Sequence, residues 1–283
     1  MAHIECRSSQ PGIASVLVEV EHITDLQVVQ ARRRLDELVA GEGQISTAVA
    51  RAFLEVAAAC PLANPSDLWQ HVIYRHLLTS GRSDNWWKRV SGFALERAIV
   101  ELYGPRLEPY GLKMRIVPSS VANDLLHALG ITSVKSSKID LFLEGRVGRA
   151  WRVFGAVHVK SSIAERIQDD VPASLALMQR GLLSIAITMD SKSYPPPHGV
   201  GINYGEFGGR SLGVEKDRIK RNYVEVGGQF DGLFSFNLRT PPSPRDTPSG
   251  KRIYTIGLHE AQPDQLVRFL LDRWSTHTTN VSI

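Results

Sequence analysis

Two charged residues stand at the ends of apolar stretches that predict β-strands. Asp140 lies within residues 139–143 and faces away from the aliphatic side chains, and Lys160 ends the apolar run 154–160, in phase with His158. A carboxylate can bind a metal ion and an ammonium can stabilise negative charge, so this pair could serve a hydrolytic reaction. Each residue also has a simpler interpretation, because half-exposed strands carry acids and a lysine at a strand end reaches solvent.

A third acid, Glu96, falls on the apolar face of a helix predicted at about 91–103. Burying an unpaired carboxylate there would cost several kcal/mol, which a nearby metal ion or lysine would offset. The alternative, that Glu96 lies at the edge of the apolar stripe and contacts water, fits the pattern equally well.

The residues after Lys160 are rich in charge and lead into another predicted helix. They include Ser162, Glu165 and Arg166 and end in Asp169 and Asp170. Such a stretch is usually a solvated helix start. An arginine can also bond guanine in a fork, and a carboxylate can accept from cytosine, so Glu165 and Arg166 could read C·G base pairs.

Periodicity predicts the elements that hold these residues. The first 80 residues are mainly helical, with a strand at 16–23, helices at 25–40 and 45–58, candidate caps Ser46 and Thr47, and a helix start at Asn64. From residue 91, strands alternate with helices, which predicts an α/β core. The strands are expected at 112–117, 139–143, 153–160 and 182–189, with helices near 91–103, 121–129 and 172–179. We expect a helical N-terminal region (1–85), a catalytic and DNA-recognition domain (86–274) with proline-rich loops at 194–199 and 241–250, and a frayed tail (275–283).

Composition narrows the class of protein. The chain has 283 residues, 43% apolar and 22% charged, with 33 Lys plus Arg against 29 Asp plus Glu. This mild positive charge is compatible with a polyanionic partner but does not require one. Cys6 and Cys60 have no CxxC spacing, no apolar run approaches a membrane span, and the start does not read as a signal peptide. These three features predict a soluble intracellular protein. Phosphate-binding, dinucleotide and zinc-protease motifs are missing from the sequence, which argues against those chemistries.

Taken together, these segments resemble the CCGG family of type II restriction endonucleases, most closely its AgeI and BsaWI branch. The resemblance covers most of the chain from about residue 61. It rests on ANPSDLW (63–69), SGFALE (91–96), KID (138–140), HVK (158–160) with AER (164–166), DDVPAS (169–174), YPPPHG (194–199), NLRTPPS (237–243) and TPSG (247–250). Each piece is weak alone, but their common order makes the resemblance specific.

The resemblance implies a restriction-endonuclease-like PD-(D/E)xK core, with a mixed central sheet flanked by helices, and assigns roles within it. Glu96 is similar to the family's helical active-site acid, Asp140 to its metal-binding acid and Lys160 to its catalytic lysine. The acid of the generic motif, two residues before the lysine, is replaced by His158. Some relatives carry a glutamate fourteen residues after the lysine, where this chain has Ser174. Asp170, or else Asp169, is the nearest candidate for that acid.

The same resemblance implies Mg²⁺-dependent cleavage of double-stranded DNA at a palindromic site with a CCGG core, leaving staggered ends with 5′-phosphates. We expect a homodimer on DNA in the bacterial cytoplasm, no membrane partner, and a companion DNA methyltransferase that is not a stable partner. The candidate DNA contacts are Glu165, Arg166, Ser162, Arg239, Lys251 and Arg252, with Lys216, Arg218, Lys220 and Arg221 as either a phosphate clamp or a solvated turn.

Three alternatives stay open at this point. The first is a repair or structure-specific nuclease of the same fold, and the second is a DNA-binding module without catalysis. The third is an unrelated α/β protein, which would lack the steep salt dependence of DNA binding.

Overall fold

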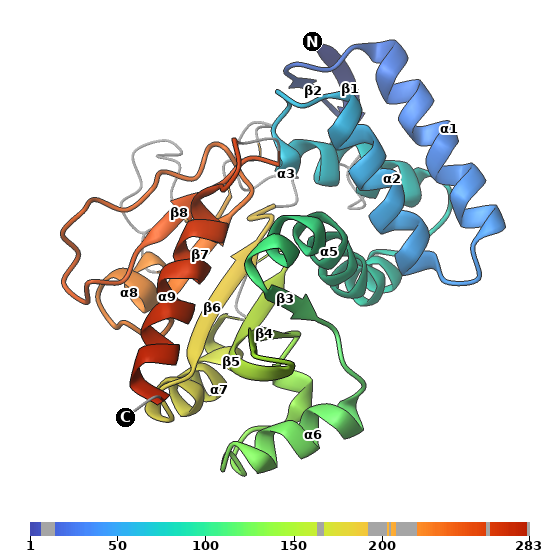
Figure 1. Cartoon of the computed structure of the whole chain (residues 1–283). Coiled ribbons are helices and arrows are strands. Elements are labelled where there is room, and N and C mark those ends of the chain that lie inside the picture. Colours follow the sequence, from blue (N-terminus) through green and yellow to red (C-terminus); the bar gives the residue numbers. More distant parts are fainter. Residues whose placement is uncertain are drawn as a thin grey trace.

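A mixed β-sheet forms the centre of the molecule (Figure 1). The computed structural model describes residues 1–6, 15–162, 167–191, 203, 205–207, 220–258 and 261–281. Within these residues the sheet has six strands, and their spatial order follows the chain. The strands are β3 (Leu112–Arg115), β4 (Leu141–Val147), β5 (Ala150–Lys160), β6 (Leu183–Thr188), β7 (Gly232–Ser235) and β8 (Ile253–Thr255). The pairs β3–β4 and β4–β5 are antiparallel and the pairs from β5 to β8 are parallel, which confirms the expected α/β fold with a mixed sheet.

Both faces of the sheet are covered by helices, because alternate residues of its strands are apolar on each side. Val157 and Val159 of β5 belong to the core shared with α5 (Asp84–Leu107) and α9 (Gln265–Val281), which lies over this face in Figure 1. Ala156, on the opposite face, packs with residues of α6 (Ser119–Ala128) and α7 (Ile167–Gln179). Lys160 is in phase with Ala156 and therefore points toward α7.

The N-terminal region combines a strand pair with helices. Strands β1 (Ala2–Cys6) and β2 (Val16–Val20) pair antiparallel, and α1 (Asp25–Gly41) and α2 (Ile45–Ala59) follow. Next come α3 (Pro65–Asp67), a π-helical stretch (Leu68–Tyr74) and α4 (Arg75–Thr79). These helices share one continuous apolar core with α5 and the sheet. The division at residue 85 stays a prediction.

Helix starts are set by local caps, and one predicted cap is wrong. Thr24 forms a capping box with Gln27 at the start of α1, and Asn64 accepts from the Ser66 amide at α3 as expected. Ser46 and Thr47 do not cap α2, because the helix already begins at Ile45. The Thr47 hydroxyl instead accepts a hydrogen bond from Arg97 (3.1 Å).

The C-terminal residues form a helix, which the sequence analysis did not predict. Residues from Ser275 were expected to be frayed, yet α9 continues to Val281. Its hydroxyl side chains donate to carbonyls one turn back, as Ser275 does to Asp272 (2.8 Å). Trp274 anchors the helix by packing against Phe154 of β5, with ring centroids 5.1 Å apart. The expected frayed tail is therefore wrong for residues 275–281, which continue the helix.

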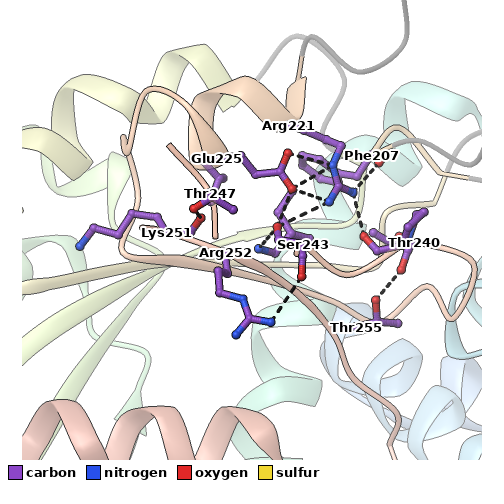
Figure 2. A network of polar contacts seen from close by, with 12 residues as sticks. Phe207, Arg221, Glu225, Thr240, Ser243, Thr247, Lys251, Arg252 and Thr255 are labelled. Carbon is purple, nitrogen blue, oxygen red and sulfur yellow. Dashed lines mark hydrogen bonds and ion pairs between the residues drawn. The ribbon is translucent and has the colours of Figure 1, made fainter. Parts of the chain in front are cut away.

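A buried arginine fixes the loop between β7 and β8 (Figure 2). Arg221 precedes α8 (Asn222–Glu225), forms a forked ion pair with Glu225, and donates to the backbone carbonyls of Phe207 (2.9 Å) and Pro241 (2.8 Å). Ser243 of the loop donates to the same glutamate. The guanidinium is therefore used inside the protein, which contradicts a phosphate-clamp role for this residue.

Of the other three residues in the expected phosphate clamp, only Lys220 is among the residues that the structure describes. Lys220 forms an ion pair with Glu206. Lys216 and Arg218 lie outside the described residues, as does the proline-rich segment 194–199. Among the helices that the structure describes, none is both long and apolar enough to cross a membrane.

Candidate active site

The ammonium of Lys160 lies between two carboxylates. Its Nζ is 2.8 Å from Oδ2 of Asp170 and 3.1 Å from Oδ2 of Asp140. Asp140 directly precedes β4, and its carboxylate also accepts from the Val159 amide of the neighbouring strand (2.6 Å). Asp170 comes from the first turn of α7, which packs over this face of the sheet. Three elements thus bring together the three side chains that the sequence analysis singled out.

The structure distinguishes the two adjacent acids at the start of α7. The Asp170 side chain is 5% exposed and contacts Lys160, whereas the Asp169 side chain is 66% exposed and lies 4.0 Å from Lys138. Of the two candidates left open by the sequence, the buried one faces Lys160.

The charge of Lys160 is set by its neighbours. Burial by itself would lower the pKa of its ammonium, but the carboxylates of Asp140 and Asp170 raise the pKa above its ordinary value. The side chain therefore stays protonated at neutral pH. It can donate hydrogen bonds and stabilise negative charge, but it cannot act as a base there.

Glu96 completes the cluster from the other side. It lies on α5 one turn before Ile99 and two before Tyr103, both in the core, and it is only 8% exposed. Burial and the nearby Asp140 raise the pKa of Glu96 to about 7, while Lys160 acts in the opposite direction. The first interpretation of the sequence pattern, a carboxylate buried next to a lysine, is the one that the structure supports.

These side chains open into a cleft of about 520 Å³. Ser91 and Ser161 meet at its wall, with their hydroxyl oxygens 3.3 Å apart. Both acidic and basic side chains line the cleft. The acidic ones are Glu96, Asp140, Asp169 and Asp170, the basic ones are Lys88, Arg89, Lys138 and Lys160, and Ser162 also lines it. A polyanion could reach the carboxylates only with cations around it, and this lining supplies them.

The acids also fit a hard divalent cation. Glu96, Asp140 and Asp170 offer only carboxylate oxygens, the ligands that Mg²⁺ prefers. Burial, and after it the charge of Asp140, raises the pKa of Glu96, and a bound cation would offset the repulsion between the two carboxylates. Within the described residues, no three Asp, Glu, His or Cys side chains are grouped closely enough to hold a metal ion by themselves. Water and substrate oxygens would have to complete the shell, as is usual for Mg²⁺.

Comparison with known proteins decides the family. The chain is 40% identical over 235 residues to the type II restriction enzyme AgeI of Thalassovita gelatinovora, which covers 79% of this chain and 82% of that protein. Its fold matches the crystal structure of an AgeI–DNA complex with a TM-score of 0.85 and 35% identity, over 96% of this chain and 99% of the other. The chain is a type II restriction endonuclease of the AgeI family. The resemblance to the AgeI branch of the CCGG family is thereby confirmed.

A second solved structure is much less similar to this chain. The structure of a BsaWI–DNA complex matches over 88% of this chain and 91% of the other, but with a TM-score of 0.46 and 19% identity. No family model matches the chain.

Three of the basic residues expected to contact DNA do not line this cleft and have partners within the protein. Arg239 pairs with Asp67 of the N-terminal region (2.5 Å) and Lys251 pairs with Asp231 (2.5 Å). Arg252 donates to a loop carbonyl and stacks over Tyr254. Of the predicted DNA contacts, Ser162 lines the cleft, while Glu165 and Arg166 lie outside the described residues.

Sequence reasoning missed a set of buried polar residues behind the acids. Ser184 of β6 contacts both His158 and Ser174. His158 and Ser174 attracted notice only as positions where the family motif has an acid. Ser184 carried no signal, since a serine in an apolar strand is unremarkable until its partners, 26 and 10 positions away, are known.

Proposed function

We propose that this restriction endonuclease uses Mg²⁺ to hydrolyse double-stranded DNA at a palindromic site with a CCGG core, leaving staggered ends with 5′-phosphates. The observation that carries the proposal is the placement of Lys160 between the carboxylates of Asp140 and Asp170, in a cleft beside Glu96. Membership of the AgeI family supports a site-specific cut, and the matching AgeI structure is a complex with DNA.

The proposed residues act on a phosphodiester through charge and position. Hydrolysis proceeds by in-line attack of water on phosphorus and needs no covalent partner. Lys160, held as an ammonium, would donate to the attacking water or to a phosphate oxygen and stabilise the added negative charge. Glu96, with a pKa of about 7, would order the water beside it and can exchange a proton with it near neutrality.

Asp140 and Asp170 would hold the cation against the scissile phosphate, with Glu96 nearby. Mg²⁺ bound there would neutralise charge that develops on the phosphate oxygens. Lys160 must give up part of its contact with the two carboxylates when phosphate and cation enter. Its two ion pairs are therefore expected to be exchanged, at least in part, for contacts with the substrate.

Specificity is proposed to come from the segment that follows Lys160. Glu165 and Arg166 would read the inner C·G base pairs in the major groove, and Ser162 lines the cleft a few residues before them. Contacts of Arg239, Lys251 and Arg252 with DNA stay a prediction, since each would have to exchange its present intramolecular partner.

The biological setting follows from the same proposal. A palindrome presents two equal half-sites, so we propose a homodimer on the DNA. The enzyme would act in the bacterial cytoplasm. A companion methyltransferase would protect the host's own sites without forming a stable complex with it.

Digestion of a sequenced plasmid tests this proposal. With Mg²⁺ we expect discrete fragments whose sequenced ends fall at sites containing CCGG and carry 5′-phosphates. Lys160→Ala should abolish cleavage while the protein still binds the duplex. Discrete fragments ending at unrelated sequences would refute the CCGG core, and cleavage without added divalent cation would refute the metal.

Two sets of variants make the test specific. Lys113 pairs with Glu144 on the same sheet (2.9 Å) but does not line the cleft, so Lys113→Ala should cut as the wild type does. Asp170→Asn should be inactive, whereas Asp169→Asn should retain activity because that side chain faces solvent. The reverse result would move the role from Asp170 to Asp169.

A further inference from the structure

The hairpin between β4 and β5 extends past the strands on either side of it. Pairing of β4 with β3 ends at Gly145, and pairing of β5 with β6 begins only at Gly155. Residues 146–151 therefore form a two-stranded ribbon, closed by a turn in which Gly148 has a φ of +61°. The ribbon lies at the end of β5 opposite Lys160, so it stands apart from the active-site cleft.

Three arginines and no acid occupy this hairpin. Residues 145–152, called the arginine ribbon below, read GRVGRAWR and carry Arg146, Arg149 and Arg152. These three account for +3 of the formal net charge of +4, so the remaining residues of the chain sum to only +1. Every residue from 146 to 152 is exposed. The excess positive charge of the chain is thus concentrated on one projecting element.

The three guanidinium groups have no carboxylate partner among the residues that the structure describes. The cations next to them in the sheet differ, because Lys113 and Arg115 of β3 both pair with the buried Glu144. That glutamate, directly before the arginine ribbon, is therefore already used. The charge of the three arginines faces solvent uncompensated, which favours an anionic partner.

Trp151 stiffens the arginine ribbon. Its ring is 42% exposed, and its backbone is the cross-strand partner of Arg146. The ammonium of Lys113 lies over the ring, 3.9 Å from its centroid. A cation over an aromatic face holds both side chains in place. The arginines therefore project from a fixed two-stranded element.

Positive charge continues from the arginine ribbon to the end of α9. Burial, and after it the charge of Arg152, lowers the pKa of His277, so Arg152 lies close to that helix. His277 and Arg273 of α9 line a cavity of about 470 Å³. Asp231 also lines this cavity, but it is paired with Lys251 (2.5 Å). This side of the molecule therefore offers cations without competing free acids among its described residues.

We propose that the arginine ribbon is a second DNA-binding surface, which holds duplex DNA outside the recognition site by its phosphates. A restriction endonuclease meets long duplex DNA as its substrate, and this ribbon is complementary to it in charge. Arginine binds a phosphate group through a planar fork of N–H donors. Contacts of this kind position a protein on DNA but carry no sequence information, so the binding is independent of sequence.

The arginine ribbon reaches DNA that the cleft does not hold. Arg152 and Lys160 are eight residues apart on β5, which corresponds to roughly 26 Å, or the length of about eight base pairs. A duplex that ends a few base pairs beyond the site and occupies the cleft is therefore too short for the ribbon. A long DNA can occupy both. Sequence-independent phosphate contacts let a protein slide along DNA, so the second contact keeps the enzyme on DNA between sites.

The salt dependence of binding tests the proposal. Each phosphate contact contributes about 0.9 to the slope of log Kd against log salt concentration. A protein with Arg146→Gln, Arg149→Gln and Arg152→Gln should bind a long duplex without CCGG more weakly, with a slope reduced by about two to three. For a short duplex that contains CCGG, its slope should equal that of the wild type. Both are measured without divalent cation, so that no DNA is cut.

A matched variant removes the same charge from another part of the molecule. Arg33, Arg34 and Arg51 on α1 and α2 each form an exposed ion pair with a glutamate. Their joint replacement by glutamine should leave both slopes unchanged. Equal effects of the two triple variants would assign the result to net charge and overturn the proposal. An unchanged slope of the arginine-ribbon variant on the long duplex would overturn it as well.

Two further measurements exclude other causes. Lysine at positions 146, 149 and 152 keeps the charge and should keep the slope on the long duplex. A slope that falls as far as in the glutamine variant would mean that the hairpin is disturbed, and would count against the proposal. A glutamine variant that loses affinity for duplex RNA but not for duplex DNA would assign the surface to RNA and overturn the proposal.

This inference goes beyond the proposed function and fails separately from it. If the wild type does not cut at CCGG but the slope on the long duplex falls in the arginine-ribbon variant, the second surface stands and the proposed specificity is wrong. If the wild type cuts at CCGG while that slope is unchanged, the proposed function stands and only the second surface is refuted.

Discussion

At the scale of single residues, burial and neighbouring charges set the pKa of each buried carboxyl group in and near the site. Glu96 is placed by α5 in a buried position beside Asp140, and its pKa rises from 4.5 to about 7. Glu144 on β4 is also buried, and burial acts to raise its pKa, but its partners Arg115 and Lys113 bring the pKa below the ordinary value. The pKa values of two buried glutamates, one on α5 and one on β4, thus shift in opposite directions because only Glu144 has cationic partners strong enough to outweigh burial.

The raised pKa of Glu96 predicts a specific pH dependence of stability. Between pH 4.5 and about 7 the folded protein holds a proton that the unfolded chain has lost, so this contribution is complete below pH 4.5 and disappears as pH rises through 7. Glu96→Gln removes it. In buffer without divalent cation, the variant should gain stability relative to the wild type by on the order of 3 kcal/mol as pH rises across this window.

Urea unfolding of both proteins at a series of pH values measures this difference. Glu144→Gln serves as the opposite-sign control, because a lowered pKa stabilises above the ordinary pKa and is lost as pH falls. Parallel stability curves for the wild type and Glu96→Gln would show that Glu96 is not perturbed.

At the scale of elements, close packing of α9 on the sheet holds the C-terminal part of the chain. Gly145 of β4 lies under the Trp274 ring, and a β-carbon built there would come within 2.5 Å of that ring. Trp274 also packs against Phe154. The absence of a side chain at one strand position therefore allows the helix to dock.

Gly145→Ala should displace Trp274 and loosen the helix. Overpacking of this kind costs about 1–3 kcal/mol, and amide hydrogen exchange should accelerate in the second half of α9. Gly92→Ala on α5 is the matched control, because nothing lies within 4 Å of the added carbon and the change should stabilise the helix by about 0.5–1 kcal/mol. Unchanged exchange in α9 of the Gly145 variant would contradict the docking role.

The elements that periodicity predicted well are those with local signals. The helices α1 and α2 and the strands β5 and β6 carry regular apolar patterns and appear close to the expected ranges. The short strands β7 and β8 were not predicted, because three or four residues contain too little periodicity. Likewise, nothing local distinguishes the last turns of α9 from a polar tail, since their order depends on Trp274 and the distant β5.

At the scale of the whole molecule, a buried polar group joins the N-terminal region to the sheet. Asn64 donates to Asn237 (3.0 Å), and Asp67 pairs with Arg239 across 172 positions of the chain. The two regions also share one apolar core. We therefore expect them to unfold together, so near-ultraviolet circular dichroism and tryptophan fluorescence should report coincident denaturation curves.

Some residues of the candidate site could be predicted from the sequence, and some contacts elsewhere in the fold could not. Glu96, Asp140, Lys160 and Asp170 were predictable because charges stand out against apolar patterns and because their order resembles a family. The role of Arg239 in joining two regions was not, since its partner Asp67 lies 172 positions away and either residue alone reads as a surface charge. Partners that meet only through the fold have no local signature.

Arg239 links the two regions through its pair with Asp67, and its structural role can be measured in the absence of DNA. The side chain of Asp67 is 3% exposed and that of Arg239 is 23% exposed, so Arg239→Ala leaves a buried carboxylate without its cation. Loss of one partner of such a pair costs about 3–5 kcal/mol, and Asp67→Asn in the same protein should restore part of it because the stranded charge is gone. Arg34→Ala, which breaks the exposed pair with Glu55, should cost little by comparison because solvent screens that pair. Urea unfolding without DNA measures all three variants, and an Arg239→Ala protein as stable as the wild type would contradict the structural role of this arginine.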